Sequence, residues 1–144
     1  MEKCATGESL PVPWIMWLAV VGIVAGIIVG LALVWAGLLK LVEGPAWPKQ
    51  AADMGVARPV ALVVPYVEIV VGVLLATHLF PPWSAIAALL LLLAFTALIV
   101  RRLADGSRPP CGCFGLRSTR PLGAYHVARN LGLLAIAVIA VVST

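Results

Sequence analysis

Four long apolar stretches follow one another along the chain, separated by short segments that hold most of the charged residues. They cover about residues 14–40, 60–80, 83–100 and 122–142. A helix needs about 20 apolar residues to cross a bilayer, because its backbone groups must bond within the segment. The pattern therefore predicts an all-α membrane protein, with residues 1–144 forming a single integral membrane domain built as a four-transmembrane-helix bundle. The first stretch is much longer than the core of a signal peptide, so we interpret it as a retained span.

The connections between the spans differ in length. FPPW at residues 80–83 is short and predicts a tight hairpin between the second and third spans. The first connection contains WPKQAADMG at residues 47–55, in which Pro48 suits the start of a helix and Gly55 its end. A short interfacial helix is therefore expected there, with Trp47 at the membrane boundary as aromatic residues often are.

Glycines recur on one face of the first span, at Gly22, Gly26, Gly30 and Gly37. Steps of four and seven residues keep these positions aligned on a helix. Small residues let helix backbones approach closely in a membrane. The face is expected to pack inside the bundle; a homodimer seam, or docking against a larger membrane complex, is the alternative.

The composition agrees with a membrane protein and adds an orientation. The chain is 62% hydrophobic and only 11% charged, which is too few charges for the surface of a soluble domain. The net charge of +4 is not the mark of a nucleic-acid partner, because the basic residues occupy loops between apolar runs. The side of the membrane that holds the first and third loops carries Lys40, Lys49, Arg58, Arg101, Arg102, Arg108, Arg117 and Arg120, whereas the terminal side carries Lys3. The positive-inside rule then places these loops in the cytoplasm and both termini outside, in a bacterial inner membrane.

Two ionisable residues inside the spans stand at similar depth. Glu68 lies eight residues into the second span and Arg129 seven residues into the fourth. With a rise of about 1.5 Å per residue, both are about 10–12 Å from the side that holds the loops. A lone charge in a low-dielectric bundle is costly, so the sequence predicts a Glu68–Arg129 ion pair, direct or through one water.

Three further polar residues are expected near this pair. His126 and Asn130 share a face of the fourth span with Arg129, and Lys40 ends the first span on the same side. His126 is a candidate proton carrier and Asn130 a candidate tie between helices. Each of these groups can also serve packing alone through hydrogen bonds, and Lys40 can extend to the interface.

The third loop contains the most reactive sequence of the chain, Cys111-Gly-Cys113. Two thiols this close can form a strained, easily reduced disulfide, and Arg108 and Arg117 would favour the attacking thiolate. Two thiolates also suit Cu, Zn or Hg, with His126 as a third ligand. A structural disulfide or a pair of inert thiols is the remaining alternative.

Cys4 lies across the membrane from this pair in the predicted topology. It cannot form a disulfide with the loop cysteines within one subunit. We interpret it as a free or incidental thiol; a relay role on the outer side is the alternative.

Several motifs together resemble one family. WAGLLKL at 35–41 ends the first span, VPYVEIVVG at 64–72 lies in the second, CGCFG at 111–115 precedes the fourth, and ARN at 128–130 lies within it. The chain resembles the MauE-type, DoxX-like four-span bacterial membrane proteins over about residues 14–142. The resemblance implies a redox-associated protein that helps to form or maintain disulfides in an exported dehydrogenase subunit.

The expected function is thiol–disulfide redox chemistry in the membrane, with the chain as a candidate oxidoreductase. Cys111, Cys113, Glu68, Arg129 and His126 are the expected catalytic residues, and Lys40 and Asn130 complete the polar cluster. Besides the lipid bilayer, a thioredoxin-like or other thiol protein is the expected partner. No cofactor is evident; a quinone is a candidate electron acceptor, and a metal belongs only to the alternative of soft-metal transport or sensing. A third reading is a non-catalytic accessory subunit of a membrane complex.

Overall fold

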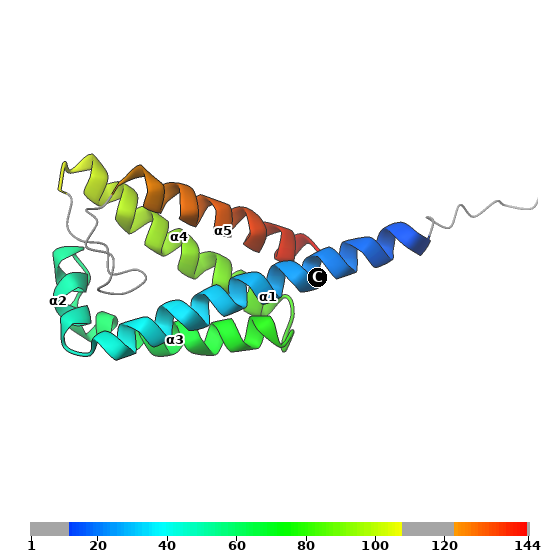
Figure 1. Cartoon of the computed structure of the whole chain (residues 1–144), viewed down its shortest axis with the longest axis horizontal. Coiled ribbons are helices and arrows are strands. Elements are labelled where there is room, and N and C mark those ends of the chain that lie inside the picture. Colours follow the sequence, from blue (N-terminus) through cyan, green and yellow to red (C-terminus); the bar gives the residue numbers. More distant parts are fainter. Residues whose placement is uncertain (1–11, 108–122, 144) are drawn as a thin grey trace, which may run out of the picture.

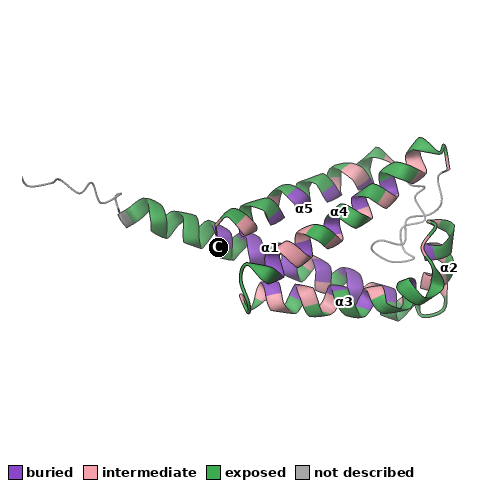
Figure 2. Cartoon of the chain, turned by 180° about the vertical axis from the view of Figure 1, so that it is seen from behind, coloured by how far each residue is buried: buried purple, intermediate pink, exposed green. Residues whose placement is uncertain are grey.

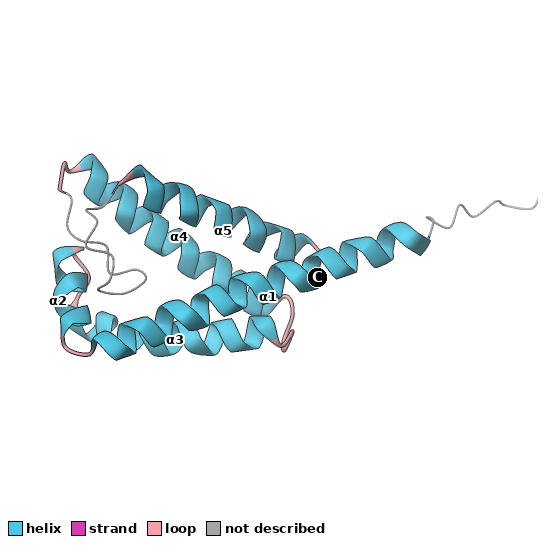
Figure 3. Cartoon of the chain, viewed as in Figure 1, coloured by secondary structure: helices cyan, strands magenta, loops and turns pink. Residues whose placement is uncertain are grey.

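The computed structural model describes residues 12–107 and 123–143, which form helices and turns without a strand. The helices are α1 (Val12–Glu43), α2 (Ala46–Asp53), α3 (Arg58–Ala76), α4 (Trp83–Ala104) and α5 (Ala124–Val142) (Figures 1 and 3). Within the described part of the chain, α1, α3, α4 and α5 are long and apolar enough to cross a membrane. The all-α, four-span prediction is therefore confirmed.

The long helices associate in two groups. α1 packs mainly against α3, while α4 packs against α5, and α1 also contacts α5. The two groups lie closer together at the end that holds the α3–α4 turn, and they separate toward the end crossed by α2 (Figure 1). The connections on either side of α2 and the last turn of α4 all lie at this wider end, as alternation of the spans requires.

The glycine face of α1 packs inside the bundle, as predicted. A Cβ atom added to Gly30 would lie 2.6 Å from the carbonyl oxygen of Gly72, and one added to Gly72 would lie 2.6 Å from that of Gly30. At Gly37 an added Cβ would lie 2.7 Å from the carbonyl oxygen of Pro65. We call these contacts of Gly30, Gly37 and Gly72 the glycine seam; here the backbones of α1 and α3 approach each other closely.

Burial follows the inward faces of the long helices (Figure 2). An apolar core is formed by Val29, Leu33, Leu75, Ala85, Ala88, Leu92, Leu134 and Ala137. Many large apolar side chains on the outer faces remain exposed, which suits a surface that meets lipid rather than water. The beginning of α1 projects beyond the other helices (Figure 1), and its Trp14 and Trp17 are 69% and 67% exposed.

The second span ends earlier than the sequence predicted. α3 stops at Ala76 rather than near residue 80. The amide of His78 donates to the carbonyl of Leu75 and that of Leu79 to the carbonyl of Leu74, the two bonds of a Schellman helix end. His78 takes the left-handed conformation, with φ of 54°, that this end requires. This position is usually occupied by glycine. Because a histidine stands there instead, the sequence did not indicate the end of the helix.

The predicted short helix in the first connection is confirmed as α2. It begins at Ala46, two residues before Pro48, and ends before Gly55, which has φ of 81°. The amide of Gly55 donates to the carbonyl of Ala52, and that of Val56 to the carbonyl of Ala51. This second Schellman end turns the chain sharply, so that α2 lies across the ends of α1 and α3 (Figure 1).

Candidate functional site

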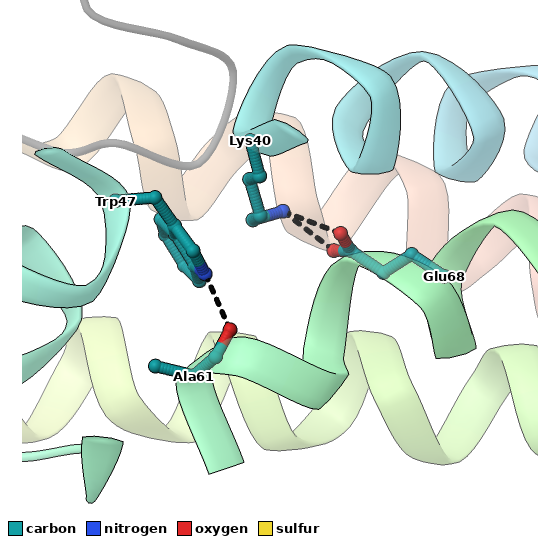
Figure 4. A network of polar contacts seen from close by, with 4 residues as sticks. All are labelled: Lys40, Trp47, Ala61 and Glu68. Carbon is teal, nitrogen blue, oxygen red and sulfur yellow. Dashed lines mark hydrogen bonds and ion pairs between the residues drawn. The ribbon is translucent and has the colours of Figure 1, made fainter. Parts of the chain in front are cut away.

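A buried ion pair joins α1 to α3 near the wider end of the bundle. The Lys40 ammonium donates to both carboxylate oxygens of Glu68, at 2.6 and 2.7 Å (Figure 4). The side chains of Lys40 and Glu68 are only 2% and 1% exposed. Each charge therefore depends on the other, because removing either would leave an uncompensated charge inside the protein.

This pairing corrects the sequence prediction, which gave Glu68 to Arg129. α3 contacts α1, α2 and α4 among the described helices, whereas α5 packs against α1 and α4. The glycine seam also draws α1 onto α3 at Gly37, where an added Cβ would lie 3.3 Å from that of Glu68. Lys40 is one turn further along α1 and reaches the carboxylate, while Arg129 lies half-buried on α5. Lys40 accordingly points into the bundle rather than out to the interface.

Two aromatic rings complete the surroundings of the Lys40 ammonium. Its nitrogen lies 5.0 Å from the ring centroid of Trp47 on α2 and 5.1 Å from that of Phe95 on α4. Both distances are within the range of cation–π attraction, which strengthens when water is excluded. We call Lys40, Glu68, Trp47 and Phe95 the ion-pair site.

Trp47 is fixed in the ion-pair site by a proline on α3. Pro65 has no amide hydrogen, so the carbonyl of Ala61, four residues earlier, has no helical donor. The indole Nε1–H of Trp47 donates to this carbonyl at 2.6 Å (Figure 4). The proline thus leaves an acceptor open at the position where the tryptophan of α2 binds.

The sequence missed the roles of Trp47 and Phe95. Trp47 carries an interfacial signal, and Phe95 lies in an uninterrupted apolar run. The one available signal was Pro65 within the second span. A proline in a helix leaves the carbonyl four residues earlier without its usual donor.

Asn130 belongs to the same cluster, as the sequence predicted. It is buried on α5 and lines a cavity of about 40 Å³ together with Lys40 and Glu68. The volume is enough for a water molecule, and the walls supply polar partners for one. The Asn130 amide also donates to the Thr96 hydroxyl at 3.5 Å, and that hydroxyl donates to the carbonyl of Leu92 at 2.7 Å.

His126 is buried one turn before Asn130 on the same helix. Its Nδ1 accepts a hydrogen bond from the amide of Gly123 at 3.3 Å, which satisfies a free donor at the start of α5. His126 therefore has a structural contact, and it is not among the residues that line the cavity.

The predicted redox cysteines, Cys111 and Cys113, lie outside the described residues, as does Cys4. The segment that contains the pair leaves the described structure after Ser107 and re-enters it at Gly123, both at the wider end of the bundle (Figure 1). Within residues 12–107 and 123–143, no group of three or more His, Cys, Asp or Glu side chains could hold a metal ion.

The fold and the site define a class: a small multi-pass membrane protein of four spanning helices with a charged, aromatic-lined site inside the bundle. Comparison with known proteins identifies the family. The family model described as methylamine utilisation protein MauE matches residues 15–143, and the chain belongs to this family. The resemblance inferred from the sequence is thereby confirmed.

One curated relative is the methylamine utilization protein MauE of Paracoccus denitrificans. It is 42% identical over 82 residues, which make up 56% of this chain and 44% of the relative. The match thus spans less than half of that protein's length. No solved structure matches the chain.

Proposed function

We propose that the chain is a membrane-embedded thiol–disulfide redox protein that supports disulfide formation or electron transfer for a partner in methylamine utilisation. The observation that carries the proposal is the buried Lys40–Glu68 pair. It lies at the wider end of the bundle, where α4 ends and α5 begins, and the Cys-Gly-Cys segment stands between these two helices in the sequence. Fixed charges inside a bundle cost stability unless they are paired, and they usually mark a working site in membrane proteins.

The proposed reaction is an exchange between two sulfur pairs. A thiolate of the reduced partner attacks the disulfide of Cys111 and Cys113 and forms a mixed disulfide. The second thiolate of the partner resolves it, so that the partner leaves oxidised and the two cysteines remain as a dithiol. Two electrons and two protons pass to this chain in each cycle. A membrane quinone, reduced to quinol by the same two electrons and two protons, would restore the disulfide.

The buried polar residues would serve the protons of this cycle. Glu68, with Lys40 as its counter-ion, holds a carboxylate beside a cavity that accommodates a water molecule. Protons released when the dithiol is oxidised can exchange with such a group. His126 and Arg129 lie on the helix that follows the cysteine segment; the former would carry protons and the latter would favour thiolate.

The charge distribution supports a cytoplasmic position for the cysteine segment in a bacterial inner membrane. Lys40 and the Arg101–Arg102 pair lie in the last turns of α1 and α4, Lys49 lies in α2, and Arg58 starts α3. All belong to the wider end of the bundle. The direct electron partner would then be a thioredoxin-like or other thiol protein of the cytoplasm, and not the exported subunit that the family resemblance implies.

Thiol labelling of the protein in intact cells tests whether Cys111 and Cys113 form a redox pair. A maleimide that adds a visible mass is applied with and without prior reduction to the wild type and to the Cys111→Ser, Cys113→Ser and Cys4→Ser variants. In the wild type we expect two additional labelled thiols after reduction. In either loop variant the remaining cysteine should be labelled with and without reduction, so that reduction adds no label, and Cys4→Ser should still gain two. An unchanged labelling count after reduction would contradict the redox pair.

A membrane-impermeant reagent distinguishes the two orientations, since it should reach the pair only in opened cells. Metal analysis of the same protein, purified under reducing conditions, separates redox from metal handling. Stoichiometric copper or zinc bound through Cys111 and Cys113 would favour the soft-metal alternative.

A further inference from the structure

A wide groove lies where α2 crosses the ends of α1 and α3. Its volume is about 720 Å³, and its walls are the last turn of α1, the α1–α2 connection, α2 and the beginning of α3. The polar side chains that line it are those of Lys40, Lys49, Arg58 and Tyr66. We call this space the basic groove. It is separate from the cavity beneath the ion-pair site, although Lys40 and Trp47 line both.

The basic groove has an excess of positive charge. None of the described residues that line it carries a carboxylate. The Lys40 ammonium is already neutralised by Glu68, and only its stem is left to form part of the wall. Lys49 and Arg58 are both exposed, and their charges remain available for an anionic ligand.

The backbone adds to this positive potential. α3 begins at Arg58, and its N-cap residue Ala57 has no side chain that could accept a hydrogen bond from the first turn. Pro59 in this turn has no amide hydrogen, so the backbone contribution comes mainly from the helix dipole, whose positive end favours an anion. The Schellman end at Gly55 fixes the connection from α2 to α3, so the elements that carry Lys49 and Arg58 are held in a defined arrangement.

The wall of the groove that is nearest the middle of the spans is apolar. Leu41 of α1 and Leu62 and Pro65 of α3 line it, and the two leucines lie on surfaces of the spans that face outward. A charged rim above an apolar wall, at the end of membrane-spanning helices, matches a molecule with an anionic head and hydrocarbon chains. A small free anion would use the rim and leave the wall unoccupied.

We propose that the basic groove binds the headgroup of an anionic phospholipid. The phosphate lies between Lys49 and Arg58, and the acyl chains follow the apolar surfaces below Leu41 and Leu62. Basic pockets between spanning helices are suited to such headgroups, and each cation near the membrane surface adds about fivefold to the affinity. The proposal does not depend on the redox chemistry, because neither cysteine takes part.

Native mass spectrometry of the purified full chain in a nonionic detergent tests it. The protein is titrated with phosphatidylglycerol or with phosphatidylcholine of the same acyl chains. We expect one tightly bound phosphatidylglycerol and at least fivefold weaker binding of phosphatidylcholine. Lys49→Gln and Arg58→Gln should each weaken phosphatidylglycerol about fivefold, and Arg58→Lys should retain most of the affinity.

Arg101→Gln is the matched control. It removes the same charge at the same end of the bundle, but Arg101 is not among the residues that line the groove. Equal losses in the control and the groove variants would overturn the proposal, as would equal binding of the two lipids. Displacement of the lipid by millimolar inorganic phosphate would overturn it in favour of a small-anion site. Unchanged helicity by circular dichroism shows that each variant is folded.

Discussion

The contact between α1 and α3 has two halves with opposite construction. In one half, Gly30 and Gly72 bring the two backbones together, and an added Cβ would meet backbone atoms at 2.6 Å. In the other half, Lys40 and Glu68 form a buried ion pair beside a cavity and two aromatic rings. Residue 37, again glycine, marks the passage from one to the other.

The two halves of this contact are therefore stabilised in different ways: one by close backbone packing, the other by an ion pair beside a cavity. Lipid offers no hydrophobic gain for helix association, so the seam depends on close van der Waals contact. The ion-pair site depends on charge, because Lys40 and Glu68 neutralise each other and the cavity beside them is lined mostly by apolar side chains. We therefore expect the seam to be sensitive to any added atom, and the ion-pair site to be sensitive to a lost charge.

Breaking the ion pair on one side should have the largest effect. Lys40→Met leaves the Glu68 carboxylate without its counter-ion, and we expect the free energy of unfolding to fall by about 3–5 kcal/mol. The double variant Lys40→Met/Glu68→Leu should recover most of this loss, because no charge remains buried. Unfolding by SDS from mixed micelles measures all three proteins. A double variant that is less stable than Lys40→Met would contradict the mutual dependence.

The contribution of the Lys40 ammonium to the ion-pair site can be tested separately by chemical rescue. Lys40→Ala leaves the Glu68 carboxylate and the rings of Trp47 and Phe95 around an empty position. We expect propylammonium to restore part of the lost stability, whereas the neutral propanol should not. Equal effects of both additives would show that volume, and not charge, is what Lys40 supplies.

Adding one carbon to the glycine seam should have the next largest effect. The Cβ of Gly30→Ala would lie 2.6–2.8 Å from the Gly72 carbonyl oxygen and from backbone and Cβ atoms of Ala76, and helix backbone cannot move aside cheaply. We expect a loss of about 2–3 kcal/mol in the same unfolding assay. Gly132→Ala is the control, since nothing lies within 4 Å of its added Cβ. It should be neutral or stabilise α5 by up to about 1 kcal/mol.

The features that the sequence predicted correctly are those set by local pattern. Length and polarity located the four spans, Pro48 and Gly55 located α2 to within two residues, and the spacing of Gly30 and Gly37 identified the inner face of α1. Each depends on residues within a few turns of one another. Such signals need no knowledge of which helix lies beside which.

The partner of Glu68 could not be predicted in this way. Depth along the spans matched Glu68 with Arg129 as well as with Lys40, and only the order of helices around the bundle decides between them. The position of Trp47 likewise depends on α2 folding back over α3. The missing hydrogen of Pro65 was visible in the sequence, but the donor that replaces it comes from another helix.

The hydrogen bond from Trp47 to Ala61 leads to a prediction with a smaller expected effect. Trp47→Phe removes the donor to the Ala61 carbonyl and should cost about 1 kcal/mol. In a Pro65→Ala background, residue 65 has an amide that can serve this carbonyl. The cost of Trp47→Phe should then shrink toward zero. Additive effects of the two substitutions in the unfolding assay would contradict the idea that Pro65 creates the acceptor for Trp47.

The weakest contact in the comparison ties α4 to α5 at the far wall of the cavity. Asn130 donates to Thr96 at 3.5 Å, a long hydrogen bond between neutral groups, and Thr96 has a shorter bond of its own to Leu92. Interhelical hydrogen bonds of this kind average about 0.6 kcal/mol in membranes. A double-mutant cycle of Thr96→Val and Asn130→Ala should therefore give a coupling energy of about 0.6 kcal/mol or less. The same cycle for Lys40→Met and Glu68→Leu should give several times as much, since charge rather than the hydrogen bond itself makes the ion-pair site dependent on both partners. Equal coupling in the two cycles would mean that the polar end is held by hydrogen bonding alone.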